Sequence, residues 1–223
     1  GEWRDGTAHG HDDFMFVKIG TGIGSGIVSN GHIHRGAQGS AGDIGHIQVR
    51  SERHEICRCG KVDCLEALAG GAAIARDGLT VAGAGGSERL TAALEEQGAL
   101  TARDVIDAAR QGDSAAMRLL AESATLVGQT LASLANFFNP SLIVIGGGVA
   151  HAGDAYLATI RQVIYARSTA LATRDLQVKL SRLGARAGVI GAASMALDQL
   201  FSEKELARWI DAGRPLASAG AAA

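Results

Sequence analysis

The sequence predicts an α/β layer fold in which a mixed sheet is covered by helices. Two short apolar runs, 14–19 and 142–145, each lead into a glycine-rich turn, as buried strands of α/β proteins do. Long segments with helical spacing of apolar residues lie between and after these runs. Because the first strand continues into hairpins, the beginning of the sheet is expected to be antiparallel.

Composition narrows the class of protein. A chain of 223 residues is long enough to bury a full core, and its net charge of −2 argues against general nucleic-acid affinity within this segment. No apolar run reaches the roughly 18 residues that a membrane-spanning helix needs. The N-terminal stretch does not resemble a signal peptide. We therefore expect a cytoplasmic protein that does not enter a membrane.

Glycine recurs at every second residue from Gly20 to Gly26, directly after the first strand. Alternate glycines let the backbone turn sharply and bring N–H groups close to a ligand. Strand character resumes at Ile27, and Asn30-Gly31 is a strong hairpin signal. The glycines thus lie on a hairpin, which disfavours a Rossmann dinucleotide site, and the sequence contains no P-loop motif. The alternative interpretation is a hairpin whose glycines serve packing alone.

The later elements follow from apolar periodicity and from capping residues. We expect a short strand over 43–49, a helix over 64–76 and a loop over 77–86. Further helices are predicted at 87–97, 101–110, 113–136, 154–171, 187–201 and 202–212, and a further strand at 176–183. The tail after Gly213 is expected to be disordered.

A cysteine cluster is the most specific chemical signal. All three cysteines of the chain fall within eight residues: Cys57, Cys59 and Cys64. Three thiolates and one imidazole complete a tetrahedral Zn²⁺ site, and spacing alone leaves His46 and His54 open as the fourth ligand. A buried or redox-active cysteine cluster is the alternative. Two acids flank the group: Asp43, which could simply stabilise a turn, and Glu66, which could simply favour a helix start.

Four segments together resemble the ROK family, which groups bacterial sugar kinases with sugar-responsive transcriptional repressors. These segments are the glycine hairpin from Gly20, the run 35–46 ending in Asp-Ile-Gly-His, the Cys-x-Cys-Gly run with Cys64-Leu-Glu66, and Ile143–Gly148. The resemblance extends from Phe14 to about Phe201. It implies an actin-like ATPase fold, similar to ribonuclease H.

The resemblance also implies roles for particular residues. It implies a structural Zn²⁺ bound by His46, Cys57, Cys59 and Cys64. It implies sugar hydroxyls bound by Asp43, His46 and Glu66. If the protein is a kinase, it implies ATP with Mg²⁺ near the two glycine turns, at Gly20, Thr21, Gly22, Gly24, Gly146, Gly147 and Gly148. With His46 as the ligand, His54 is expected to be a surface residue. The other histidines, which are His9, His11, His32, His34 and His151, have no partner pattern.

The chain departs from the family pattern in two places. The family usually has Glu at the position of Asp43 and Gly at the position of Asp63. Residues 1–212 resemble the C-terminal sugar-binding lobe, with a zinc loop inserted at 46–64. The family's N-terminal lobe, with its own phosphate-binding turn and general-base Asp, and any DNA-binding domain are expected to lie outside this chain.

These features favour a repressor's sugar-sensing domain over an ATP-dependent sugar kinase. The chain has no evident general base and no lysine within the glycine hairpin, and Lys18 in the preceding strand is expected on a solvent or core-edge face. We therefore expect no catalytic residue here. The expected partners are a small sugar, DNA through a separate domain, and further copies of the protein in a dimer or tetramer. A structural zinc module within an interaction protein is a third possibility.

Overall fold

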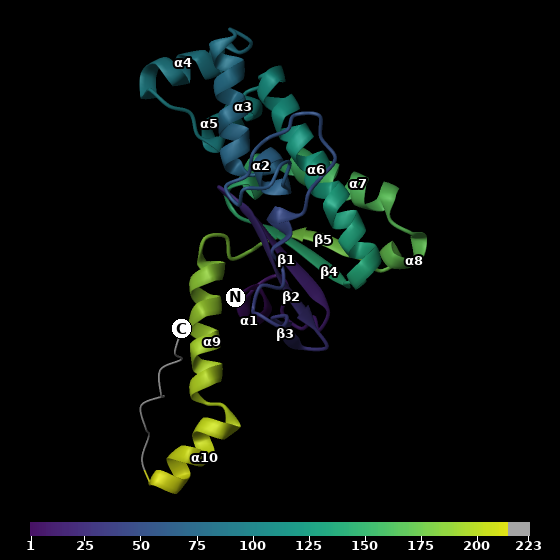
Figure 1. Cartoon of the computed structure of the whole chain (residues 1–223), viewed down its shortest axis with the longest axis vertical. Coiled ribbons are helices and arrows are strands. Elements are labelled where there is room, and N and C mark those ends of the chain that lie inside the picture. The colour runs from purple at the N-terminus through teal and green to yellow at the C-terminus, as the bar shows by residue number, and fades with distance from the viewer. Residues whose placement is uncertain (214–223) are drawn as a thin grey trace.

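One five-stranded sheet organises the computed structural model, which describes residues 1–213. The strand order is β3-β2-β1-β4-β5 (Figure 1), and the strands are β1 (Phe14–Ile19), β2 (Ile23–Ser29), β3 (His32–His34), β4 (Leu142–Gly146) and β5 (Gln177–Leu180). The β1–β2 and β2–β3 pairs are antiparallel, whereas β1–β4 and β4–β5 are parallel. The predicted mixed α/β sheet with an antiparallel beginning is confirmed.

The central strand β1 separates two apolar clusters. Met15, Val17 and Ile19 belong to the large core, and the alternate residue Phe14 belongs to a smaller cluster on the other face. This period-2 alternation follows from the geometry of a pleated strand. Every residue of β4, which lies between β1 and β5, is buried. The Asn30-Gly31 hairpin is also confirmed, with φ of 50° and 69° at the two residues.

Helices cover the sheet unevenly. Figure 1 shows α6 (Ser114–Phe138) and α7 (Asp154–Arg167) packed side by side, with α3 (Gly71–Gly83), α4 (Glu88–Gln97) and α5 (Ala102–Arg110) grouped at one end of the molecule. Short helices are α1 (Glu2–Asp5), α2 (Leu65–Ala69) and α8 (Ala170–Thr173). The last two helices, α9 (Arg186–Leu200) and α10 (Glu203–Ala212), extend away from the sheet. No helix within residues 1–213 is both long and apolar enough to cross a bilayer.

The prediction of a strand over 43–49 is wrong. This segment forms a 3₁₀ turn, η1 (Ile44–His46), and only a single bridge joins Gln48 to Cys64. The turn packs closely against β2, since a Cβ on Gly45 would lie 2.1 Å from the Ile23 carbonyl oxygen. A local sequence pattern cannot reveal such a backbone-to-backbone approach.

The helix predicted over 64–76 is divided at Gly70 into α2 and α3, and α3 continues through most of the loop predicted over 77–86. The division has a tertiary cause, because the Gly71 N–H donates to the Gly20 carbonyl oxygen at 2.7 Å. Gly78 lies inside α3 and packs against Val105, since a Cβ there would come within 2.6 Å of Val105 Cγ2.

The other predicted elements are present with shifted ends. The helix predicted over 154–171 ends at Arg167 and is followed by α8, and the strand predicted over 176–183 is shorter at both ends. A second 3₁₀ segment, η2 (Gly148–Ala152), follows the glycine turn after β4. The tail predicted to be disordered lies outside the described residues from position 214 onward.

Candidate functional site

The cysteine cluster gathers four metal-ligating side chains: His46, Cys57, Cys59 and Cys64. Their ligand atoms all lie within 4.8 Å of one another. The Cys59 and Cys64 Sγ atoms are 3.6 Å apart, and the Cys57 Sγ lies 3.5 Å from His46 Nδ1. Tetrahedral zinc with bonds of about 2.3 Å to sulfur and about 2.0 Å to nitrogen requires separations of roughly 3.8 and 3.6 Å. The donor set therefore fits a closed Zn²⁺ site, and the thiols are free rather than disulfide-bonded.

Local backbone structure builds this loop. The Cys57 N–H donates to the Lys61 carbonyl at 2.8 Å, and the Gly60 N–H donates to the Cys57 carbonyl at 2.8 Å, which closes a tight turn. Asp63 adopts a left-handed conformation with φ of 56°, and its carboxylate accepts the Glu55 N–H at 2.8 Å. A short polar side chain that hydrogen-bonds locally tolerates this conformation.

The two histidines that spacing left open have different environments. His46 lies in the cluster, whereas His54 is exposed and its Nδ1 lies 4.0 Å from Asp63 Oδ2.

Burial raises the pKa of the Cys64 thiol to about 12, whereas a backbone hydrogen bond at Lys61 lowers the pKa of Cys59. A bound cation would favour the thiolate form of both residues.

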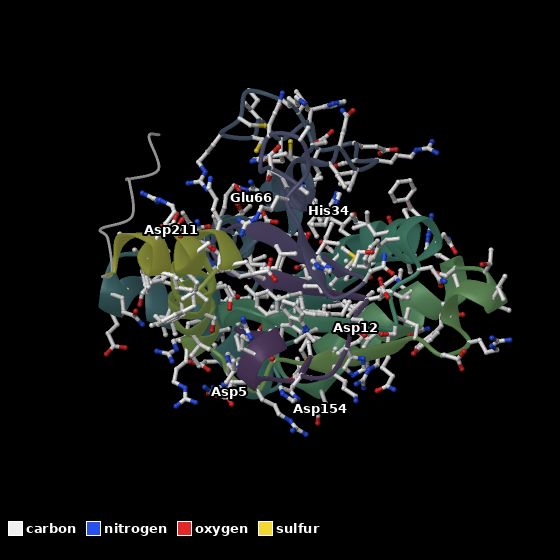
Figure 2. The ribbon with its side chains drawn as sticks, turned by 90° about the horizontal axis from the view of Figure 1, so that it is seen from below. Asp5, Asp12, His34, Glu66, Asp154 and Asp211 are labelled. Carbon is white, nitrogen blue, oxygen red and sulfur yellow. The ribbon has the colours of Figure 1, made fainter. Side chains whose placement is uncertain are left out.

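Glu66 lies beneath the loop that carries the sulfur atoms (Figure 2). Its Oε2 accepts the Ile23 N–H at 2.9 Å, and its Oε1 accepts a hydrogen bond from Arg58 at 3.1 Å. Burial tends to raise the pKa of this carboxyl, but the hydrogen bonds from Ile23 and Arg58 outweigh that effect, so the pKa is lowered. Glu66 is therefore an ionised hydrogen-bond acceptor.

Asp43 and His46 lie next to one another. His46 Nδ1 faces the sulfur atoms, and its Nε2 lies 3.9 Å from Asp43 Oδ1. Glu66 also lies close to this turn, since its Cβ is 3.4 Å from the position of a Cβ on Gly45. The structure thus brings the three predicted sugar-binding residues to one region. Asp43 is the most exposed of them, with 61% of its side-chain surface accessible, against 16% for Glu66.

The glycine turns border a separate cavity of about 920 Å³ at the carboxyl ends of β1 and β4. Of the seven residues predicted to contact a nucleotide, Gly20, Thr21 and Gly148 line this cavity. The other four residues are Gly22, Gly24, Gly146 and Gly147, and they do not line it.

Three cations line the same cavity: Lys18, to which the sequence analysis gave no role, and Arg103 and Arg110, which it did not single out. Lys18 is exposed, as expected, yet it lies beside the glycine turn. A Cβ on Gly20 would be 3.4 Å from Lys18 Cε and 3.9 Å from its Nζ. The strand register held a usable signal, because Lys18 pairs with Gly24 on one side and with Gly146 on the other.

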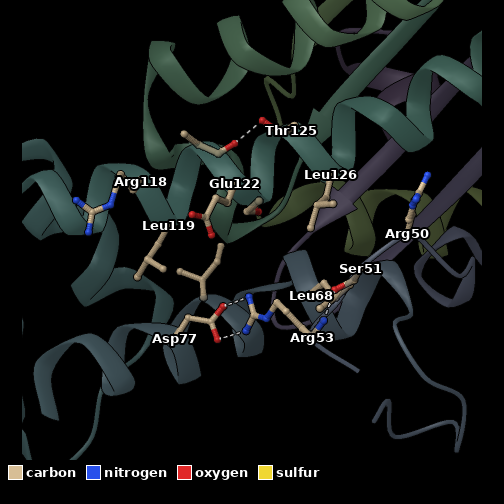
Figure 3. A pocket seen from close by; sticks show the side chains of 13 residues that line it. Arg50, Ser51, Arg53, Leu68, Asp77, Arg118, Leu119, Glu122, Thr125 and Leu126 are labelled. Atoms are coloured by element: carbon tan, nitrogen blue, oxygen red, sulfur yellow. Dashed lines mark hydrogen bonds and ion pairs between the residues drawn. The ribbon is translucent and has the colours of Figure 1, made fainter. Parts of the chain in front are cut away.

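A second cavity of about 420 Å³ lies between the zinc loop, α3 and α6 (Figure 3). Arg53 of the loop forms a bidentate pair with Asp77 of α3 at 2.8 and 2.6 Å. Arg76 also binds Glu55, at 3.2 Å. Bidentate arginine–carboxylate pairs fix orientation as well as distance. This network therefore attaches the zinc loop to α3.

Comparison with known proteins agrees with this geometry. The chain matches the ROK family over residues 1–199. It is 38% identical over 199 residues to a glucokinase of Halalkalibacterium halodurans. That match covers 89% of this chain and 60% of the glucokinase. A ROK glucokinase from Streptomyces griseus, solved with glucose and AMPPNP, superposes with a TM-score of 0.77 at 34% identity, over 87% of this chain and 63% of that one.

A ROK transcriptional regulator, a homologue of the Escherichia coli MLC protein, has a TM-score of 0.71 at 31% identity. That match covers 81% of this chain and 44% of the regulator. The chain thus spans less than two thirds of each of these relatives, which include both kinases and a regulator. On the family match and these similarities, the chain belongs to the ROK family and has its actin-like fold.

Proposed function

We propose that residues 1–212 form the sugar-binding lobe of a ROK-family transcriptional regulator, in which a neutral sugar binds beside a structural zinc loop. The observation that carries this proposal is the convergence of Glu66 of α2 with Asp43 and His46 at the turn η1. Carboxylates and an imidazole can bind vicinal hydroxyl groups, and such polar readout distinguishes epimers well, because a missing hydroxyl leaves a buried group unpaired.

The two ring nitrogens of His46 would have different roles. Its Nδ1 lies 3.5 Å from the Cys57 Sγ and would bind Zn²⁺, which would supply a fixed structural support for the loop. Its Nε2 then carries the proton and can donate to a sugar oxygen. Glu66 is held in place by the Ile23 N–H and accepts from a sugar hydroxyl. Asp43 would orient His46 or bind a neighbouring hydroxyl.

A sensor of this kind acts by a change in population between conformations. We propose that the bound sugar alters how this lobe sits against the rest of the protein, and that a DNA-binding domain outside this chain and a second copy of the protein respond to the change. The similarity to the ROK transcriptional regulator that is a homologue of the MLC protein supports this proposal.

A sugar kinase is the second candidate. It is supported by the similarity to glucokinases and by the cavity at the glycine turn with Lys18. In that case ATP with Mg²⁺ would supply the phosphoryl group, and a general base from outside this chain would be needed.

Two measurements test the proposal. Calorimetry with a panel of hexoses and N-acetylhexosamines should detect a preferred sugar. A coupled assay should then detect no sugar-dependent ADP formation by the full-length protein. Phosphorylation of the preferred sugar at a steady turnover would establish the kinase instead, and an absence of binding by every sugar would contradict a sugar site.

A further inference from the structure

Arg58 of the zinc loop contacts the carboxylate that is proposed to bind the sugar. Its Nη2 donates to Glu66 Oε1 at 3.1 Å. We propose that Arg58 is a positioning residue of the sugar site, which fixes the orientation of the Glu66 carboxylate for a sugar hydroxyl. This inference rests on the proposed function and adds to it a residue that is not a metal ligand.

The two oxygens of Glu66 have different partners. Oε2 accepts the Ile23 N–H at 2.9 Å and lies against the glycine hairpin, where it leaves no room for a side chain at Gly22. Oε1 is therefore the oxygen left for a sugar. A carboxylate oxygen can accept two hydrogen bonds, so the bond from Arg58 leaves Oε1 one further acceptor position.

A second hydrogen bond changes how firmly the carboxylate of Glu66 is held. The last torsion of a glutamate side chain has broad preferences, so the single bond from Ile23 would leave the plane of the carboxylate free to turn. The bond from Arg58 to the other oxygen fixes that plane. A group that is fixed before its ligand arrives loses less freedom on binding, so Arg58 should raise the affinity for the sugar.

Local structure places Arg58 over Glu66. Arg58 lies between Cys57 and Cys59, which are two of the proposed zinc ligands, and within the turn that the Gly60 N–H closes on the Cys57 carbonyl at 2.8 Å. Its backbone is thus held on both sides, whereas its side chain is 81% exposed. Such exposed ion pairs contribute little to stability. Loss of the Arg58 side chain should therefore affect the sugar site and leave folding unchanged.

Variants of Arg58 test this role by calorimetry on the full-length protein. The probes are the hexoses and N-acetylhexosamines, glucose and N-acetylglucosamine among them, and the variants are compared on the sugar that the wild type binds most tightly. Arg58→Met should weaken its binding about tenfold, and Arg58→Lys should recover part of the loss. Zinc content and melting temperature should stay at the wild-type values. Lys61→Met removes an exposed cation of the same loop and is the matched control.

A double-mutant cycle distinguishes positioning from a general effect on the loop. In Glu66→Gln, the amide oxygen is needed for the Ile23 N–H, so the amide nitrogen faces Arg58 and cannot accept from it. Arg58→Met should then weaken binding by less than about threefold in this background.

The outcomes separate the role of Arg58 from the sugar site itself. The same loss in both backgrounds, or wild-type or tighter binding by Arg58→Met, would overturn the role of Arg58 and leave the sugar site intact. A wild-type protein that binds none of the sugars would overturn both.

Discussion

The carboxylate of Glu66 accepts a hydrogen bond from the backbone N–H of Ile23 at 2.9 Å, which joins the first turn after the zinc loop to the first residue of β2. The contact leaves no room for a side chain at Gly22, since a Cβ there would lie 2.0 Å from Glu66 Oε2. The Glu66 carboxylate, which is proposed to bind the sugar, is thus fixed to the glycine hairpin. Through the bonds of Gly71 and Ala72, α3 is fixed to the hairpin as well.

The first prediction concerns Glu66. Glu66→Ala removes an acceptor of sugar hydroxyls and leaves the Ile23 N–H without its partner, so sugar affinity should fall by at least about tenfold. Glu66→Gln should be intermediate, because its amide oxygen can still accept from Ile23. Calorimetry with the preferred sugar measures both variants, and Glu52→Gln, which changes an exposed acid of the neighbouring zinc loop, is the control. Unchanged affinity in Glu66→Ala would remove this residue from the site.

The second prediction concerns the metal. Cys59 is the exposed member of the cluster, so Cys59→Ser removes a ligand with little change in core packing. We expect the variant to lose stoichiometric zinc and to melt at least about 5 °C lower than the wild type. Elemental analysis and thermal unfolding provide the two readouts, and Lys61→Ser tests the same loop without touching a ligand side chain. Full zinc content and unchanged melting in Cys59→Ser would contradict the zinc site.

The third prediction compares two neighbouring glycines. Gly147 has φ of 93°, and a Cβ there would lie 2.4 Å from the Ile19 carbonyl oxygen, whereas a Cβ on Gly148 would meet nothing within 4 Å. Gly147→Ala should therefore lower the free energy of unfolding by about 2–4 kcal/mol. Gly148→Ala should change it by less than about 1 kcal/mol. Urea unfolding of the pair decides the matter, and equal stabilities would show that the turn after β4 can relax.

The fourth prediction concerns the loss of stability at low pH. Asp113 caps α6 and accepts hydrogen bonds from Ser87 Oγ at 2.6 Å and from the Ala116 N–H at 2.9 Å. Burial tends to raise the pKa of this carboxyl, but the hydrogen bonds from Ser87 and Ala116 prevail and lower it. A lowered pKa adds stability above the unfolded value of about 3.9, and this stability is lost as the pH falls through the folded pKa.

Asp113→Asn separates the cap from the charge, because Asn also caps helices well but does not titrate. The difference in unfolding free energy between wild type and Asp113→Asn should be constant near pH 6 and shrink below about pH 4. Denaturant unfolding at several pH values gives this difference. A gap that is independent of pH would mean that ionisation of Asp113 contributes nothing.

Sequence alone determined the strands of the central sheet, most helices and the three thiols of the cysteine cluster. These features depend on neighbouring residues: alternation along β1, capping by Ser87, Thr101 and Ser202, and a spacing that places three thiols on one short loop. Such information is local, so a single sequence displays it.

Tertiary structure decided what depends on contacts between distant segments. The turn at Ile44–His46 in place of a strand, the division of the helix at Gly70, and the passage of α3 through Gly78 each arise where a backbone or side chain of another element approaches closely. The position of Lys18 is a further case. Periodicity predicts only which face of a strand it occupies, whereas its place beside Gly20 depends on the bare glycines of the two adjoining strands, β2 and β4.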